Sequence, residues 1–237
     1  MKGMFNLIRF GIAISVLGFM IYFAGINNKE NYCKLTDITI EMDENVFVTN
    51  DVINDYLLDN NLHPDSIKMN DVSFKNIESL LANHPSIKSA NVYSDMQGKV
   101  FVSVVQRKPI VRVQNGKDGY YLDEDGLRMP LSNEYTARML LITGDVNSVN
   151  ESDLYYLSDF IRKDKFLKKQ IVQIDVSDSE LLMLTQIGEQ VEFGQIKEVG
   201  EKFEKLKLYY EKGNSQNQEY KALNLKYKNQ IVCIKNK

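Results

Sequence analysis

Apolar residues form one unbroken run near the start of the chain. The run FGIAISVLGFMIYFAGI, from Phe10 to Ile26, contains no charged residue. A helix needs roughly 17–25 residues to cross the hydrocarbon core of a bilayer. The pattern therefore predicts a single transmembrane helix over residues 10–26.

Two basic residues, Lys2 and Arg9, precede this run, and no acidic residue does. Positive residues beside a membrane helix stay on the cytoplasmic side. We therefore expect a cytoplasmic N-terminus over residues 1–9, with the bulk of the chain exported.

A cleaved signal peptide is the main alternative to an anchor. Cleavage after Ala24 or Gly25 would put Tyr22 or Phe23 at a position that requires a small residue. The flanks therefore favour an uncleaved anchor over a signal peptide, and over a buried core helix.

The next segment alternates between strand and helix periodicity. A strand-like run at 35–42 is followed by Thr49, a good N-cap residue for a first helix. A second helix starts near Asp71 and ends before Pro85. The apolar positions of the two helices are Val52, Ile53, Tyr56 and Leu57, then Phe74, Ile77, Leu80 and Leu81. Strands at 88–94 and 99–106 follow, joined by a turn. The order β-α-α-β-β predicts a compact α+β domain over residues 35–107.

The remaining residues, 108–237, are rich in strands. Arg107-Lys108-Pro109 marks the boundary, because proline cannot donate to a central strand ladder. Two Asp-Gly pairs, Asp118-Gly119 and Asp125-Gly126, indicate hairpin turns. Strands are expected at 139–143, 171–176, 181–186, 190–193, 222–226 and 230–234. Helices are expected after Asn150, which should cap the first of them, and over 196–210. The pattern predicts a mixed or antiparallel β domain with flanking helices.

Composition offers little catalytic material. The formal net charge of −3 argues against binding to nucleic acid, and two His and two Cys leave little for a zinc site. His63 and His84 each precede a proline, and no nucleophile or phosphate-loop motif is present. The acidic run from Asp123 to Gly126 fits a turn rather than a calcium loop. We expect no enzyme, cofactor, metal or small-molecule substrate.

Four local patterns resemble the FtsQ/DivIB family of bacterial cell-division proteins. They are IESLLANHPSIKSANVY (77–93), VVQRKPIVRV (104–113), YYLDEDGLRMPLS (120–132) and ALNLKYKNQIVC (222–233). The first is similar to the end of a POTRA helix, and the second to the family's Q-R-x-P interdomain hinge, here Arg107 and Pro109. The third resembles its Y-x-D-x-x-G hairpin, and the fourth its terminal D-L-R-Y strand. Asn224 and Lys226 depart from that last motif, and Lys lacks the planar fork of Arg. The absence of Trp resembles members of the family from Bacteroidota.

The resemblance implies a scaffold of the divisome in the cell inner membrane. A POTRA domain and a β domain would lie in the periplasm at the division septum and link early and late division proteins. The implied partners are FtsB and FtsL, with further contacts to FtsK, FtsW and FtsI.

The resemblance also implies that the C-terminal edge strand recruits FtsB by strand addition. Lysines crowd the last seventeen residues, and Glu219 is the last acid. These lysines are Lys221, Lys226, Lys228, Lys235 and Lys237. Lysines guard an edge against promiscuous pairing and steer an acidic partner. The expected partner-binding residues are Leu223, Leu225, Lys226, Tyr227, Lys228, Gln230 and Val232.

Three other interpretations stay open. The last strand could be a solvated terminal strand with lysines on its wet face. The chain could be a POTRA-containing envelope assembly or export factor, or an envelope enzyme.

Cys33 and Cys233 are expected as unpaired thiols, although a disulfide between them would suit an oxidising compartment.

Overall fold

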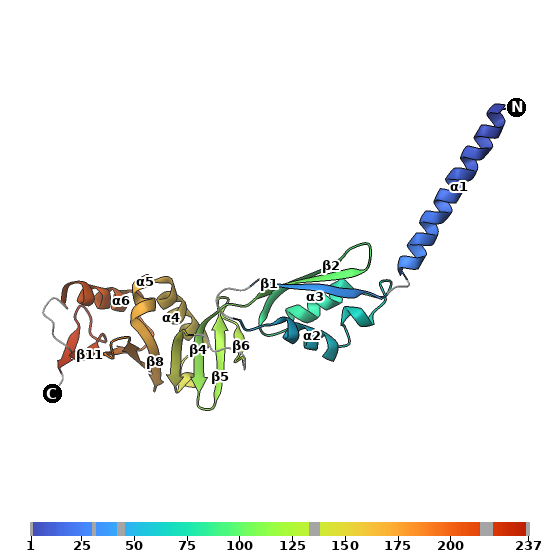
Figure 1. Cartoon of the computed structure of the whole chain (residues 1–237). Coiled ribbons are helices and arrows are strands. Elements are labelled where there is room, and N and C mark those ends of the chain that lie inside the picture. The colour runs from blue at the N-terminus through green and yellow to red at the C-terminus, as the bar shows by residue number, and fades with distance from the viewer. Residues whose placement is uncertain (1, 30–31, 42–45, 133–137, 214–219, 236–237) are drawn as a thin grey trace. The chain divides into compact units, whose positions relative to one another are not determined.

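The computed structural model describes residues 2–29, 32–41, 46–132, 138–213 and 220–235 (Figure 1). The chain divides into two compact units, Met1–Gln106 and Arg107–Lys237, which are called here the N-terminal and the C-terminal unit. Each unit has its own hydrophobic core.

The first helix, α1 (Lys2–Lys29), contains the predicted anchor. Its described apolar side chains are exposed, among them Phe10 at 67%, Phe19 at 66% and Tyr22 at 68%. Within the residues that the structure describes, no helix combines the length and apolar character that crossing a membrane requires. The anchor at residues 10–26 stays a prediction.

The rest of the N-terminal unit has the predicted order of elements. These are β1 (Lys34–Glu41), α2 (Asn50–Asp59), α3 (Phe74–Ala82), β2 (Ile87–Ser94) and β3 (Lys99–Gln106). The sheet order is β1-β3-β2, with β1 parallel and β2 antiparallel to β3. The sequence pattern did not predict the 3₁₀ turn η1 (Pro64–Ser66) between the helices. The βααββ prediction is confirmed.

Local chemistry explains where the two helices begin. The Thr49 hydroxyl accepts a hydrogen bond from the backbone N–H of Val52 and caps α2 as predicted. The predicted start of α3 near Asp71 was three residues too early, because Ser73 provides the N-cap. Each helix packs two buried apolar side chains against the buried valines of β3. They are Ile53 and Leu57 in α2, and Ile77 and Leu81 in α3.

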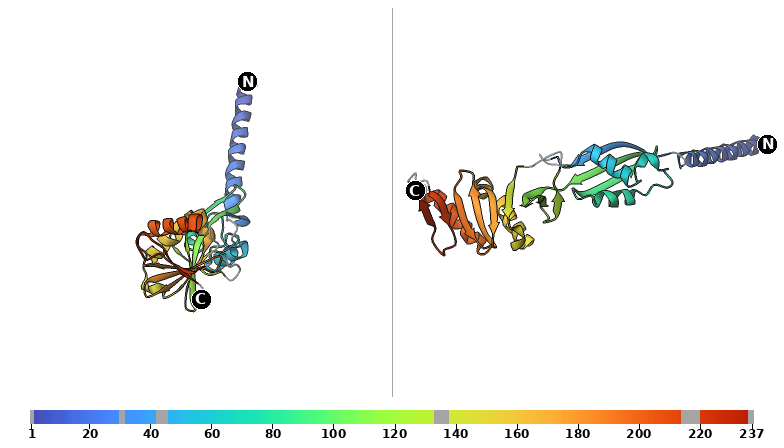
Figure 2. Two further views of the ribbon diagram at one scale, coloured as in Figure 1. Left: turned by 90° about the vertical axis from the view of Figure 1, so that its left-hand side faces the viewer. Right: turned by 90° about the horizontal axis from the view of Figure 1, so that it is seen from below.

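The C-terminal unit is a nine-stranded mixed sheet with helices on one side (Figures 1 and 2). Its order is β12-β11-β10-β9-β8-β7-β4-β5-β6. The strands are β4 (Pro109–Asn115), β5 (Asp118–Asp123), β6 (Arg128–Pro130), β7 (Leu140–Gly144), β8 (Ile171–Ser177), β9 (Glu180–Thr185), β10 (Gln190–Gly194), β11 (Tyr220–Asn224) and β12 (Val232–Lys235). The helices are α4 (Glu151–Lys163), α5 (Lys165–Gln170) and α6 (Val199–Leu208). Two short turns, η2 (Val146–Ser148) and the π-helical η3 (Tyr209–Gly213), complete the unit.

One face of this sheet packs against the helices, and no helix among the described residues covers the other. Ile174, Met183 and Val191 form the core with Leu157 of α4 and Phe203 of α6. Residues that alternate with these strand positions point the other way. We call this second side, carrying Gln173, Asp175, Leu182, Leu184, Gln190 and Glu192, the open face.

Three local predictions were wrong. The first hairpin turns at Gly116-Lys117, because Asn115 pairs with Asp118 and Gly116 adopts a φ of +59°. Asp118-Gly119 therefore lies in β5. Asn150 precedes α4, but its side chain does not cap it. Helix α6 begins at Val199 rather than near residue 196, after Glu198 in a left-handed conformation.

Candidate partner-binding edge

Strand β12 lies at one edge of the nine-stranded sheet. Within the described part of the chain it pairs with β11 and has no strand on its other side. An edge strand exposes unpaired backbone N–H and C=O groups, to which another chain can add a strand. The geometry therefore provides one template for strand addition.

The side chains of β12 divide between the two faces. Cys233 lies opposite Leu223 and packs against the core. Val232 and Ile234 lie opposite Asn224 and Ala222 and are exposed by 40% and 41%. An added strand would meet two apolar side chains on the open face.

The link between β11 and β12 is longer than predicted, because residues 225–226 and 230–231, which were expected as strand, lie outside the two strands. The chain leaves the sheet after Asn224 and re-enters it at Val232. Five of the seven expected contact residues lie in this link: Leu225, Lys226, Tyr227, Lys228 and Gln230. Leu223 and Leu225 are 0% exposed and belong to the core, so a partner cannot reach their side chains in this state. A binding role for the other residues stays a prediction.

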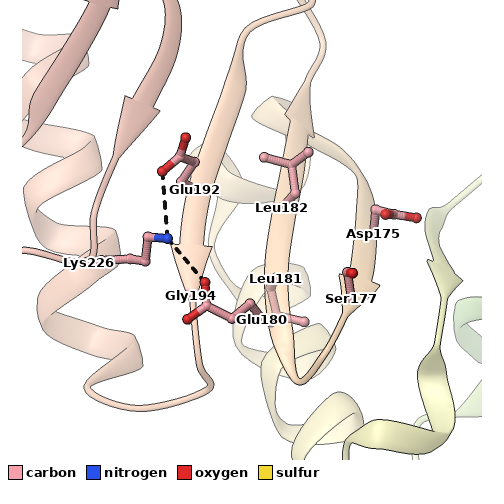
Figure 3. A pocket seen from close by; sticks show the side chains of 8 residues that line it. All are labelled: Asp175, Ser177, Glu180, Leu181, Leu182, Glu192, Gly194 and Lys226. Atoms are coloured by element: carbon pink, nitrogen blue, oxygen red, sulfur yellow. Dashed lines mark hydrogen bonds and ion pairs between the residues drawn. The ribbon is translucent and has the colours of Figure 1, made fainter.

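Lys226 makes contacts within the unit (Figure 3). Its Nζ lies 3.1 Å from Oε2 of Glu180 in β9 and 3.8 Å from Oε2 of Glu192 in β10. The hydrogen bond to Glu180 leads the causes that raise the pKa of Lys226 above its ordinary 10.5, against some desolvation. Lys226 therefore stays charged at neutral pH and ties the link to two strands.

Asn224 contributes to the same cluster through both ends of its amide. Its Nδ2 donates to Oε2 of Glu192, and its Oδ1 accepts from the backbone N–H of Lys226 at 3.0 Å. An Asp at this position would keep the second bond but would place a carboxylate against Glu192. The departure from the family pattern at residue 224 thus suits the neighbouring glutamate.

A lysine of α6 fixes the other side of the link. Lys205 Nζ donates to the carbonyl oxygens of Leu225 at 3.1 Å and Tyr227 at 2.6 Å. The Tyr227 side chain is 51% exposed, and Lys228 and Gln230 are exposed as well. Of the predicted lysine-rich tail, Lys221 and Lys235 are exposed, whereas Glu219 and Lys237 lie outside the described residues.

A shallow hollow adjoins this cluster on the open face. Its volume is about 160 Å³, and its lining is Asp175, Ser177, Glu180, Leu181, Leu182, Glu192, Gly194 and Lys226 (Figure 3). Among the described residues, no group of three His, Cys, Asp or Glu side chains is placed to hold a metal ion.

The predicted hinge residue Arg107 is held by the C-terminal unit. Its Nη1 donates to Oδ2 of Asp123 at 2.8 Å, and Asp123 is 1% exposed. The other carboxylate oxygen, Oδ1, accepts the backbone N–H groups of Asp125 and Leu127 and shapes the β5–β6 turn. Pro109 is the first residue of β4, where a strand tolerates proline. Their role as a hinge, and that of Lys2 and Arg9 in topology, stay predictions.

The sequence did not single out several residues of the site. Glu180, Glu192 and Gly194 come from strands far from residue 226 along the chain, and Lys205 comes from a helix. Only the pairing of β9, β10 and β11 brings them together. The sequence could have indicated Ile234 as a contact residue, because it directly follows Cys233 in the last apolar run and so points to the opposite face of the strand.

Comparisons with known proteins agree with this division of the chain. The family model described as "FtsQ/DivIB, C-terminal related" matches residues 108–234, and that for a POTRA-like domain matches residues 31–105. No curated protein matches. One similar solved structure is the major extracytoplasmic domain of the trans isomer of the cell-division protein DivIB from Geobacillus stearothermophilus. It is 10% identical, with a TM-score of 0.28, over 35% of this chain and 75% of that chain.

Proposed function

The chain belongs to the FtsQ/DivIB family of cell-division proteins, and from that membership we propose that it is a non-enzymatic scaffold of the divisome. It links early and late division proteins at the septum. The family-model matches to both a POTRA-like domain and the C-terminal domain support this proposal.

The scaffold is a single-pass protein of the inner membrane. Residues 10–26 form its anchor, and Lys2 and Arg9 keep the N-terminus in the cytoplasm. Both units then lie in the periplasm. The uncharged run and the basic flank support this topology.

Partner recruitment uses the edge of β12 on which the described residues place no further strand, and this edge is the observation that carries the proposal. An FtsB-type protein, with FtsL bound to it, adds a strand there. Backbone hydrogen bonds supply affinity, and Val232 and Ile234 supply side-chain contacts. Lys221, Lys228 and Lys235 attract an acidic partner segment. FtsK, FtsW and FtsI are further partners, with FtsK on the POTRA side.

Depletion of the protein followed by microscopy tests the cellular role. The proposal predicts filamentous cells that lack late division proteins at midcell. Cells that still divide but show outer-membrane assembly defects would instead favour a POTRA-containing export factor.

A further inference from the structure

Three large side chains are exposed at one end of the N-terminal unit. Tyr32 is 61% exposed, Tyr93 is 53% exposed and Met96 is 93% exposed. The backbone N–H of Lys34 donates to the carbonyl of Gly98 at 2.9 Å, so the start of β1 lies beside the β2–β3 turn that carries Met96 (Figure 1). The three side chains therefore belong to one end of the unit.

The neighbourhood extends this apolar surface. The Tyr93 ring stacks on Phe101 with centroids 5.2 Å apart and an interplanar angle of 16°. Both alternate with buried valines, Val92 and Val100, and so lie on the side of the sheet away from α2 and α3. The surface thus contains two tyrosines, a phenylalanine and a methionine, and the exposed Asp37 of β1 lies opposite Phe101 at its border.

The basic and acidic side chains at this end differ in their contacts. Lys34 and Lys99 face each other across β1 and β3 and are both exposed. Asp95, the acid of the turn, accepts the backbone N–H groups of Gln97 at 2.8 Å and Lys99 at 2.9 Å through Oδ1. Both lysines are thus exposed, while this carboxylate is engaged in the turn.

The chemistry matches the boundary between lipid and water. Tyrosine is enriched at that depth because its ring is apolar and its hydroxyl is polar. Lysine places its aliphatic stem along apolar surface and its ammonium among head groups, where anionic lipids attract it.

The chain also keeps this end close to the bilayer. Tyr32 follows Ile26 by six residues, so even an extended chain separates them by at most about 20 Å. Helix α1 continues to Lys29, which shortens the distance further. A surface that carries Tyr32 itself therefore begins next to the head groups.

We propose that the surface formed by Tyr32, Tyr93, Met96, Lys34 and Lys99 rests in the head-group region of the membrane and orients the N-terminal unit. This inference rests on the proposed membrane anchor. A docked surface would fix the direction in which the unit leaves the membrane.

The absence of Trp from the sequence makes a direct test possible. Single-Trp variants of the full chain are reconstituted into vesicles of phosphatidylethanolamine and phosphatidylglycerol that carry brominated lipid, with the bromine near the head group in one preparation and near the bilayer centre in a second, because Phe19 lies in the middle of the proposed span. Met96→Trp reports on the proposed surface and Phe19→Trp on the anchor. Ile187→Trp, in the β9–β10 turn and 66% exposed, is the matched control in the C-terminal unit.

We expect bromine to quench the Trp fluorescence of the Phe19→Trp and Met96→Trp proteins at least twofold and to leave Ile187→Trp unchanged. Quenching at residue 19 without quenching at residue 96 would overturn the inference and leave the anchor intact. No quenching at residue 19 would overturn the anchor and with it the proposed topology. Equal quenching at residues 96 and 187 would show general adsorption and would also overturn the inference.

A second variant separates contact from simple tethering. Tyr32→Glu and Tyr93→Glu, added together to the Met96→Trp protein, should reduce its quenching by half or more. Unchanged quenching would mean that the short tether alone keeps residue 96 near the lipid, which contradicts a docked surface.

Discussion

The aliphatic part of Lys226 lies directly against Gly194. A Cβ atom on Gly194 would come within 2.8 Å of Lys226 Cγ, and Gly194 has a φ of +75°. Glycine at the end of β10 therefore makes room for the lysine that reaches Glu180 and Glu192. This close approach joins the link before β12 to the body of the sheet.

Gly194→Ala should destabilise the protein by about 1–3 kcal/mol through backbone strain. Displacement of the Lys226 side chain should add to this loss. Gly188→Ala is the matched control, since Gly188 has a φ of +88° and no atom within 4 Å of an added Cβ. Urea unfolding should therefore show a larger loss for Gly194→Ala. A Lys226→Ala background should remove the difference, and an equal loss in both variants would contradict the contact.

Lys226→Met keeps the aliphatic stem but removes the ion pairs. Because Lys226 is partly exposed, the free energy of unfolding should change by about 1 kcal/mol or less. The link should loosen locally, so amides of residues 225–231 should exchange hydrogen faster. Lys228→Met, at an exposed neighbour, should leave exchange unchanged. Equal exchange in the Lys226→Met and unaltered proteins would show that the ion pairs do not hold the link.

Arg107→Met should destabilise the C-terminal unit by about 3 kcal/mol, because it leaves the buried carboxylate of Asp123 without its charged partner. Arg128→Met is the control. Arg128 is 63% exposed in its pair with Glu151, so its loss should amount to about 1 kcal/mol or less. Chemical denaturation of the two variants measures the difference, and similar values would refute a structural role for the Arg107 pair.

Asp164 gives the C-terminal unit an acid-sensitive contact. The hydrogen bond from Lys207 leads the causes that lower the pKa of Asp164 below its ordinary 3.8. A carboxyl group with a lowered pKa stabilises the fold above its unfolded pKa, and this contribution is lost as the pH falls through its folded pKa. Asp164→Asn should therefore cost about 0.5–1 kcal/mol at pH 7 and progressively less as the pH falls below 3.8.

The control for this prediction uses the second role of Asp164. Its Oδ1 also accepts the backbone N–H groups of Phe166 and Leu167 and caps α5. Asn can replace that cap but Ala cannot, so Asp164→Ala should cost about 1 kcal/mol more than Asn at neutral pH. Urea unfolding between pH 2 and pH 7 gives both values. A cost for Asp164→Asn that does not change with pH would contradict the ion pair.

Local patterns were sufficient to predict most of the fold. The βααββ order followed from the sequence because its signals depend only on neighbouring residues. These signals are the alternation in β3, the Thr49 cap and the end of the second helix at His84-Pro85. Helix α5 was missed because it has six residues and a single buried side chain, Leu167. The first hairpin was misplaced because Asn115-Gly116 and Asp118-Gly119 are competing turn signals, and strand pairing selects the former.

The candidate site was harder to predict for a different reason. Its position near the C-terminus followed from the resemblance, but the extent of each strand did not. Asn224, Glu192 and Lys205 end β11 through contacts between residues that are distant in sequence. The sequence pattern of residues 222–234 alone therefore predicted that both strands extend into the link.

Binding of an FtsB-type partner to the full chain tests the central claim most directly. The double variant Val232→Asp and Ile234→Asp places charges on the β12 edge, and Val172→Asp in β8, where Val172 is 39% exposed, is the control. Circular dichroism should first confirm that both variants fold. Strand addition predicts at least tenfold weaker binding, about 1.4 kcal/mol, for the double variant and unchanged binding for Val172→Asp. Undiminished binding of the folded double variant would contradict the account.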